Sequence, residues 1–233
     1  DPNEITLAPY QKKSKNGPDI AYHKSGETRS YKDPNIQYKT GADGLLKIAP
    51  KTQRALIHGY YACTSFIDAQ IGRVIAQLKK ENLAKNTIIV VWGDHGWHLG
   101  DHSLWNKHSN FEQATRSPLL IYNPNNPSAV TVKAPTEFVD VFPTLCEMSQ
   151  LPIPKQLDGM DLSPLMEGSQ SNVKGVAISQ WSKGKNTGYS FRNENYRYTC
   201  WLKANKKSTD GVRLRDIWVE ELYDYTNDPL ETT

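Results

Sequence analysis

Apolar positions along the chain follow two periods, one typical of helices and one typical of strands. Over residues 51–80 they recur at alternating steps of three and four, which predicts a helix with one stripe packed against a sheet. The stripe consists of Ile57, Tyr60, Thr64, Ile67, Ile71, Val74 and Leu78. Continuous apolar runs over residues 87–92 and 118–122 predict two buried strands, of the kind found in doubly wound sheets.

The sequence of the second half of the chain predicts shorter helices and strands. A helix is expected over residues 137–149, with Pro143 as an internal kink or a break, and a loop over residues 150–170. Beyond the loop, short apolar runs separated by turn residues predict a small antiparallel sheet. Its expected strands span residues 173–181, 187–192, 196–203 and 217–223.

These elements divide the chain into two predicted domains with an α/β fold. Residues 1–150 form the α/β part, and residues 151–233 form a C-terminal α+β subdomain with short antiparallel strands. Residues 1–50 combine proline and tyrosine with many polar residues, which predicts a long irregular excursion.

Composition narrows the class of protein without deciding a function. Hydrophobic residues make up 37% and aromatic residues 10% of the 233 positions, which is typical of a folded protein. The net charge of +3 suits a polyanionic ligand but is too small to indicate nucleic acid. No apolar run reaches membrane-spanning length. Cys63, Cys146 and Cys200 are odd in number and widely spaced, so we predict buried free thiols.

Chemistry-bearing residues gather in one segment, residues 87–111. Asp94 and His95 directly follow the first apolar strand, and ligands of open α/β sheets bind beyond the carboxyl ends of strands. A carboxylate beside an imidazole can ligate a metal ion, and Lys107 adds a positive charge suited to an anion. The segment therefore has the pattern of half an active site.

Histidines crowd the same segment and open a second interpretation. Since imidazole binds zinc, four histidines within fourteen positions fit a zinc hydrolase: His95, His98, His102 and His108. Their spacing is not H-E-x-x-H and no cysteine is near, so this is the weaker interpretation. His23 and His58 carry no motif.

A longer motif runs from residue 93 to residue 111: G-D-H-G-W-x-L-G-[DE]-H, followed by W-x-K and S-N-F. It resembles the metal-site segment of the iduronate-2-sulfatase branch of the sulfatase family. Most other sulfatases have Asp-Asn where this chain has Asp94 and His95. The family belongs to the alkaline-phosphatase-like superfamily. The resemblance therefore implies helices sandwiching a mixed sheet, here in part, and a small antiparallel C-terminal sheet.

Further segments resemble the family in the expected order, so that the resemblance covers nearly the whole chain. They are NEITLAP at 3–9, TEFVDVFPTL at 136–145, LDGMDLSPLM at 157–166, YRYTCWL at 196–202 and ELYDYTNDPLE at 221–231.

The resemblance also implies an activity and roles for single residues. It implies a sulfuric ester hydrolase with a calcium ion and a formylglycine nucleophile. Asp94 and His95 are the implied metal ligands, and Lys107 is the implied catalytic residue, in contact with the sulfate. Trp97 either stacks on a sugar ring of the substrate or is a packing residue, and His98 faces either the substrate or solvent.

Two family features are not found in this sequence. They are the C/S-x-P-x-R motif that carries the formylglycine and the paired aspartates that complete the metal site. We therefore expect the C-terminal portion of a longer sulfatase, which is inactive alone and has the N-terminal portion as its partner. The implied substrate is a sulfated polysaccharide or oligosaccharide, with a 2-O-sulfated uronic acid favoured. The implied location is periplasmic, secreted or lysosomal.

Two further classes of protein stay open. A phosphoester or phosphonate hydrolase of the same superfamily can use the same carboxylate and histidine at a strand end, although the D-G-x-x-L-x-P-L loop argues against it. A sulfatase-like domain without catalysis would serve as a binding module. The nucleophile motif of the upstream sequence would distinguish these classes.

Overall fold

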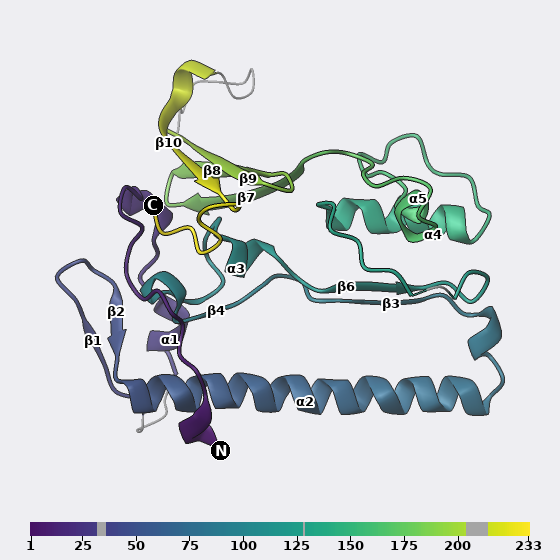
Figure 1. Ribbon diagram of the computed structural model, residues 1–233, viewed down its shortest axis with the longest axis horizontal. Helices are drawn as coiled ribbons and strands as arrows, with labels where there is room; N and C mark the ends of the chain where they lie inside the picture. The colour runs from purple at the N-terminus through teal and green to yellow at the C-terminus, as the bar shows by residue number, and fades with distance from the viewer. Residues whose placement is uncertain (32–35, 128, 204–213) are drawn as a thin grey trace. The chain divides into compact units, whose positions relative to one another are not determined.

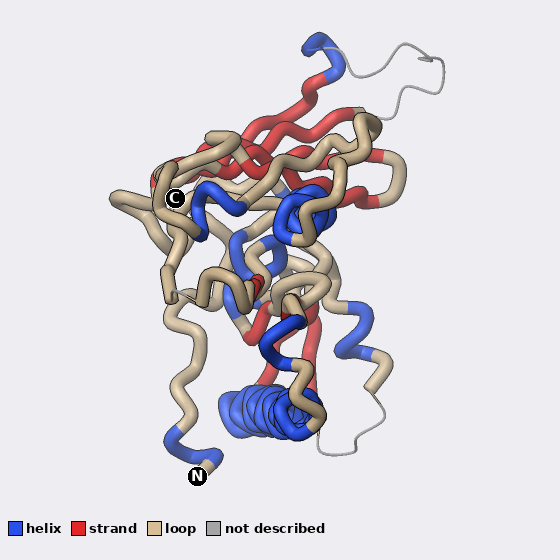
Figure 2. The backbone as a smooth tube through the Cα atoms, turned by 90° about the vertical axis from the view of Figure 1, so that its right-hand side faces the viewer, coloured by secondary structure: helices blue, strands red, loops and turns tan. Residues whose placement is uncertain are grey.

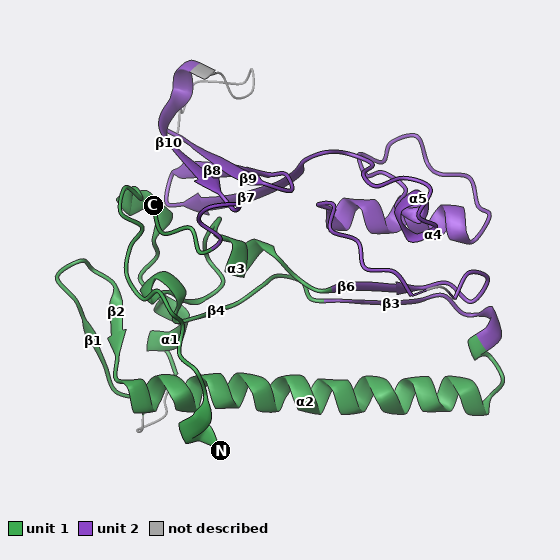
Figure 3. Ribbon diagram, in the orientation of Figure 1, with its two compact units in different colours: residues 1–84, 93–118, 230–233 green, residues 85–92, 119–229 purple. Residues whose placement is uncertain are grey.

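The computed structural model describes residues 1–31, 36–127, 129–203 and 214–233. The chain packs as two compact units, shown in Figure 3. Unit 1 comprises Asp1–Ala84, Gly93–Pro118 and Leu230–Thr233, and unit 2 comprises Lys85–Trp92 and Leu119–Pro229. These units are defined by packing alone, and the domain boundary expected at residue 150 stays a prediction.

The long helix of unit 1, α2, spans Pro50–Lys80 and confirms the helix predicted over 51–80 (Figure 1). It begins with a proline, whose missing N–H costs nothing in the first turn of a helix. The buried residues of α2 are Gln53 and Ile57. Ile57 packs in a core with three buried residues from other segments, Leu46, Ile48 and Trp105.

The expectation that the apolar stripe of α2 packs against a sheet along its length is wrong in this structure. Ile67 is 54% exposed and Val74 is 70% exposed. The reason is that the core around Ile57 covers only the first turns of the helix, and the remaining turns carry no buried residue. An amphipathic pattern predicts the helix, but it does not say which segment covers its apolar face.

The rest of unit 1 is built from short elements, in agreement with an irregular N-terminal excursion. A hairpin pairs its two strands antiparallel, with Thr40 opposite Leu46. A second pair places His98 opposite Asn106. In chain order these elements are η1 (Pro2–Glu4), η2 (Asp19–Ala21), α1 (Gly26–Arg29), β1 (Tyr38–Thr40), β2 (Leu46–Ile48), β4 (His98–Leu99), η4 (Asp101–Ser103), β5 (Trp105–Asn106) and α3 (Glu112–Thr115).

Unit 2 contains the two predicted apolar strands as β3 (Ile89–Trp92) and β6 (Leu119–Tyr122), after the short helix η3 (Ala84–Asn86). They pair with each other antiparallel, and in the described part of the chain no further strand joins them. The full burial expected of both strands is therefore wrong in this structure. A two-stranded ribbon cannot bury both of its faces, and Leu120 stays 60% exposed.

The helix predicted over 137–149 is present as η5 (Phe138–Asp140) followed by α4 (Val141–Met148). Pro143 does not break α4, because it lies in the first turn of that helix, where backbone N–H groups have no partner within the helix. The predicted loop over 150–170 contains one short helix, α5 (Ser163–Met166).

The predicted C-terminal sheet is confirmed as a four-stranded antiparallel meander in the order β10-β9-β8-β7 (red in Figure 2). Its strands are β7 (Ala177–Lys183), β8 (Asn186–Arg192), β9 (Tyr196–Leu202) and β10 (Ile217–Asp224), the last preceded by η6 (Leu214–Asp216). This sheet carries a cluster of buried polar side chains. The Arg197 guanidinium donates to Ser190 Oγ at 3.0 Å, and Trp201 Nε1 donates to Glu221 at 2.6 Å.

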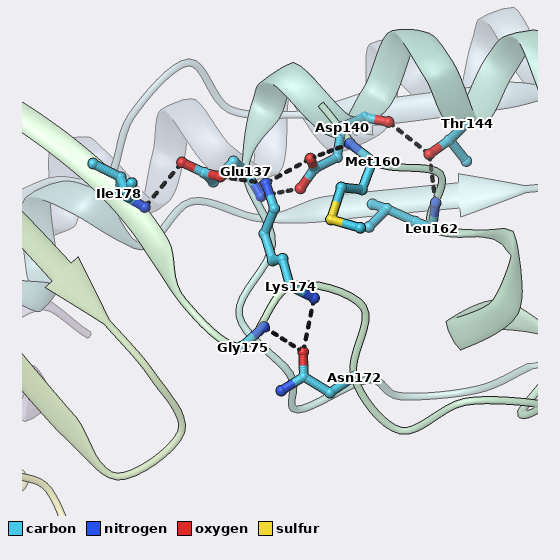
Figure 4. A network of polar contacts seen from close by, with 9 residues as sticks. All are labelled: Glu137, Asp140, Thr144, Met160, Leu162, Asn172, Lys174, Gly175 and Ile178. Atoms are coloured by element: carbon cyan, nitrogen blue, oxygen red, sulfur yellow. Dashed lines mark hydrogen bonds and ion pairs between the residues drawn. The ribbon is translucent and has the colours of Figure 1, made fainter. Parts of the chain in front are cut away.

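A buried ion network ties η5 to the segment that precedes β7 (Figure 4). Asp140 is fully buried and accepts hydrogen bonds from Met160 N at 2.9 Å and from Lys174 Nζ at 2.6 Å. Glu137 is the second carboxylate beside Lys174, and it also accepts from Ile178 N at 2.9 Å. Two segments about forty residues apart in sequence are thereby joined within unit 2.

The expected burial of the three cysteines is confirmed for two of them. Cys146 and Cys200 are buried free thiols as expected, whereas Cys63 is exposed on α2, so the expectation of burial is wrong there. Among the residues that the structure describes, no helix combines the length and the apolar character needed to cross a membrane.

Candidate functional site

Asp94 and His95 lie in unit 1, in the turn that follows β3. The Asp94 side chain is 85% exposed, and its Oδ2 lies 3.4 Å from Nε2 of His95. The other ring nitrogen of His95, Nδ1, lies 2.8 Å from the carbonyl oxygen of Gly96. Because a carbonyl only accepts, Nδ1 carries the hydrogen in this contact, which leaves Nε2 as the nitrogen available to bind a metal.

Glycine is required at position 96 because two backbone segments approach each other there. Gly96 N donates to Ala114 O at 2.8 Å, which joins the turn to α3. A Cβ at position 96 would meet the carbonyl oxygen of Gln113 and would lie 2.5 Å from that of Arg116. Both are backbone atoms, so the turn carrying His95 cannot accept a side chain here without moving.

Trp97 connects the Asp94–His95 pair to the predicted sulfate-binding lysine. Its ring stacks on His95, with centroids 5.8 Å apart and an interplanar angle of 23°. The ammonium of Lys107 lies 5.3 Å from the centroid of the Trp97 ring, within range of a cation–π interaction. The structure thus brings together four predicted site residues, Asp94, His95, Trp97 and Lys107, in one unit.

Two residues that the sequence analysis did not assign to the site also lie here. Tyr60 of α2 stacks on Trp97 with centroids 6.2 Å apart, and Glu27 of α1 pairs with Lys107 at 3.4 Å. Tyr60 belongs to the apolar stripe and Glu27 to the irregular excursion, so neither has a motif or spacing that would reveal it. Their approach is a tertiary contact.

The loop that carries Lys107 is anchored at its start by Asn106. Its side-chain oxygen accepts hydrogen bonds from Thr28 N at 3.1 Å and from Thr28 Oγ1 at 2.7 Å. Asn106 has a positive φ of 75°, which turns the backbone immediately before Lys107. The side chains of Lys107 and Glu27 are each about one-third exposed.

His98 lies in a different environment from the one that a substrate contact requires. Its ring is fully buried, and its Nε2 lies 2.7 Å from Ser109 Oγ. Burial, with smaller effects from His102 and His23, holds the pKa of His98 well below its ordinary value. In this structure the neutral ring packs inside unit 1, so His98 faces neither solvent nor a position open to substrate.

The crowded histidines do not converge on a common centre. His102 is buried and stacks on Phe111, with ring centroids 4.3 Å apart. Across the described ranges, no three histidine, cysteine, aspartate or glutamate side chains are arranged to hold a metal ion. The zinc interpretation therefore gains no support, and Asp94 with His95 would supply two of the six to eight ligands that calcium takes.

Comparisons with protein families match nearly the whole chain. The sulfatase family model matches residues 8–150. A second model, described as N-sulphoglucosamine sulphohydrolase, C-terminal, matches residues 100–233.

Similar proteins have sulfatase names. A sulfatase of Formosa agariphila is 35% identical over 72% of this chain and 32% of its own length. The iduronate 2-sulfatase of Mus musculus is 30% identical over 97% of this chain and 52% of its own length. The human iduronate 2-sulfatase is 29% identical with the same coverage. The chain thus spans between about a third and half of these relatives.

Solved structures share the fold. The phosphonate monoester hydrolase of Silicibacter pomeroyi has a TM-score of 0.70 at 24% identity, over 98% of this chain and 46% of its own. The enzyme of the same name from Agrobacterium radiobacter has a TM-score of 0.66 at 24% identity, over 79% of this chain and 38% of its own. A protein solved with its substrate D-glucosamine-2-N,6-O-disulfate has a TM-score of 0.62 at 23% identity, over 79% and 37%. These likenesses show part of an alkaline-phosphatase-like fold.

Proposed function

The chain belongs to the sulfatase family, and on that premise we propose that it is part of a sulfuric ester hydrolase of the iduronate-2-sulfatase type. The proposed substrate is a sulfated polysaccharide or oligosaccharide, with a 2-O-sulfated uronic acid favoured. The observation that carries the proposal is the cluster of Asp94, His95, Trp97 and Lys107 within unit 1.

In this proposal the carboxylate of Asp94 and Nε2 of His95 hold a calcium ion. The structure supports this through the Nδ1 contact of His95 with Gly96, which directs Nε2 toward Asp94. When bound, a divalent cation supplies positive charge to the oxygens of a sulfate ester. Further ligands and the formylglycine nucleophile are proposed to come from the portion that relatives have and this chain does not cover.

Lys107 is proposed to bind the sulfate group and to stabilise the charge that develops as the ester bond breaks. An ammonium offers three hydrogen-bond donors, and Glu27 holds it near the Trp97 ring. Trp97 orients the His95 ring and the Lys107 side chain, because it contacts both of them. The partly buried Trp97, with Tyr60 stacked beside it, is proposed to contact a sugar ring.

The preceding portion of the same sulfatase is proposed as the partner of this chain. The exposed apolar stripe of α2 supports this, since Ile67 and Val74 lie on the face that the helical period assigns to a core. Large exposed apolar faces on a folded protein mark surfaces that another segment covers.

A second candidate is a phosphonate or phosphoester hydrolase. It is favoured by the fold shared with the phosphonate monoester hydrolase of Silicibacter pomeroyi over 98% of this chain. Sulfate and phosphonate monoesters both present anionic oxygens, so the same carboxylate, imidazole and ammonium suit either group. A sulfatase-like binding module without catalysis is the third outcome of the experiment below.

The experiment compares full-length wild-type protein with Lys107→Ala, with Lys133→Ala as the control at an exposed lysine. Substrates are 2-O-sulfated uronic acid disaccharides, 6-O-sulfated glucosamine and a phosphonate monoester. We expect cleavage of the 2-O-sulfated disaccharide and an approximately hundredfold loss of kcat in Lys107→Ala. The melting temperature should hardly change, because a partly exposed ion pair contributes about 0–1 kcal/mol.

Each other result has a defined meaning. Cleavage of the phosphonate alone would support the second candidate, and binding without turnover would support the binding module. Full activity of Lys107→Ala would remove Lys107 from the site.

For the metal, Asp94→Asn should lower the calcium content of the full-length protein, and stoichiometric zinc in the wild type would refute the calcium assignment.

A further inference from the structure

Residues 230–233 belong to unit 1, although the preceding 111 residues from Leu119 to Pro229 belong to unit 2 (Figure 3). Lys15 N donates to Thr232 O at 2.8 Å, and Ser14 Oγ donates to Glu231 O at 2.5 Å. The Glu231 side chain is fully buried, and its backbone has a positive φ of 55°. Both features are costly for a glutamate, so they persist only where surrounding contacts compensate.

One compensating contact joins Glu231 to the loop that carries Lys107. Its Oε2 accepts a hydrogen bond from Glu112 N at 3.0 Å. Glu112 is the first residue of α3, and such N–H groups at a helix start have no partner within the helix. The carboxyl group of Glu231 therefore satisfies a donor that the helix itself leaves open.

Further contacts link the segment around Glu231 and the segment around Glu112 through a third segment of the chain. Phe111, directly before Glu112, is buried, and its ring centroid lies 5.4 Å from that of Tyr22. The Tyr22 hydroxyl donates to Ser14 Oγ at 3.0 Å, and Ser14 in turn binds the backbone of Glu231. Segments 14–22, 107–112 and 230–233, far apart in sequence, thus fix one another.

We propose that Glu231 is a positioning residue for Lys107. Asn106 anchors the start of the loop through Thr28, and Glu231 anchors its end through Glu112. Lys107 lies between these anchors, so releasing the end lets the ammonium move away from the Trp97 ring, which stacks on His95. This inference rests on the proposed role of Lys107 in sulfate ester hydrolysis.

The test uses the full-length enzyme and three variants at glutamates. Glu231→Ala removes the acceptor, Glu231→Gln keeps an acceptor oxygen, and Glu194→Ala is the control at an exposed glutamate of unit 2. We expect Glu231→Ala to lower kcat at least about tenfold with KM little changed, since a misplacement of about 1 Å can cost a hundredfold. Glu231→Gln should stay within about threefold of wild type, and the control should be unchanged.

A double-mutant cycle separates positioning from general stability. In a Lys107→Ala background, Glu231→Ala should cause no further loss of kcat, because it acts through the lysine that is already absent. Losses that multiply would overturn the inference. If Glu231→Ala does not fold, Ser14→Ala takes its place in the cycle, with an expected loss of about threefold that likewise vanishes in the Lys107→Ala background.

Amide hydrogen exchange gives a readout that does not need turnover. In Glu231→Ala, exchange across residues 107–112 should increase at least about tenfold while exchange in β7–β10 stays unchanged. Unchanged exchange across 107–112 would overturn the anchoring role. If Lys107→Ala keeps full activity, the proposed function fails at that residue, whereas the exchange result still decides whether Glu231 holds the loop.

Discussion

Replacing Lys174 by methionine is expected to destabilise unit 2 by about 3 kcal/mol, the lower end of the 3–5 kcal/mol typical of breaking a buried ion pair. The Lys174 side chain is 9% exposed, and its Nζ contacts Glu137 and the fully buried Asp140. Methionine has a similar volume without the charge, so the change leaves two carboxylates uncompensated. The lower end applies because Asp140 keeps its hydrogen bonds from two backbone N–H groups, those of Glu137 and Met160.

The same network predicts a pH dependence. Burial lowers the pKa of Lys174, but hydrogen bonds and charges from Asp140 and Glu137 outweigh it, and the pKa is raised above its ordinary value. A raised lysine pKa stabilises the folded state fully below the unfolded pKa of about 10.4. This contribution is lost as pH rises through the folded value. Wild-type unit 2 should therefore lose stability at alkaline pH, and Lys174→Met should show a smaller loss because the contribution of Lys174 is absent.

The assay is native-state hydrogen exchange of the full-length protein, because it reports the stability of unit 2 separately from that of unit 1. The amides of Met160 and Ile178 report directly, since both donate to carboxylates of the network. Lys185→Met, at an exposed lysine between β7 and β8, is the matched control. A loss below about 0.5 kcal/mol in Lys174→Met would refute the reasoning, since that is the range of ordinary surface changes.

Two further predictions concern unit 1. The pKa of the buried His98 is well below its ordinary value, so the unfolded chain binds a proton first as pH falls below about 6.5. Thermal stability should therefore decrease in that pH range. In melting curves measured against pH, His98→Asn should weaken this decrease, and His58→Asn, at an exposed histidine, should not. Gly96→Ala should lower the melting temperature by several degrees because its Cβ would meet backbone atoms, whereas Gly72→Ala on α2, with open space around it, should raise stability by about 0.5–1 kcal/mol; equal melting temperatures for both variants would contradict the close approach at Gly96.

Local structure was largely predictable from the sequence. The helix over 51–80, the strands around 87–92 and 118–122 and the C-terminal antiparallel sheet all follow from periods and turn residues that lie within a few positions of one another. Exact ends were less predictable. The strand expected from residue 173 begins at Ala177, because Gly175 adopts a positive φ of 71° and turns the chain just before it.

Burial was less predictable than the elements themselves. The apolar period of α2 and the apolar runs of β3 and β6 predicted buried faces, but Val74, Trp92 and Leu120 are each more than half exposed. A period records which face prefers an apolar environment. Which segment covers that face depends on chain far away in sequence, and no local pattern contains that information.

The candidate site was likewise predictable only in part from the sequence. The sequence by itself determined which residue types follow one another from Asp94 to Lys107, and the family resemblance together with that order was enough to propose a metal pair and an anion-binding lysine. Only the tertiary structure decided that Tyr60 and Glu27 join them, that His98 is buried, and that Glu231 returns to hold the loop end. These contacts link residues up to 119 positions apart, and such distances are bridged by packing rather than by any period along the chain.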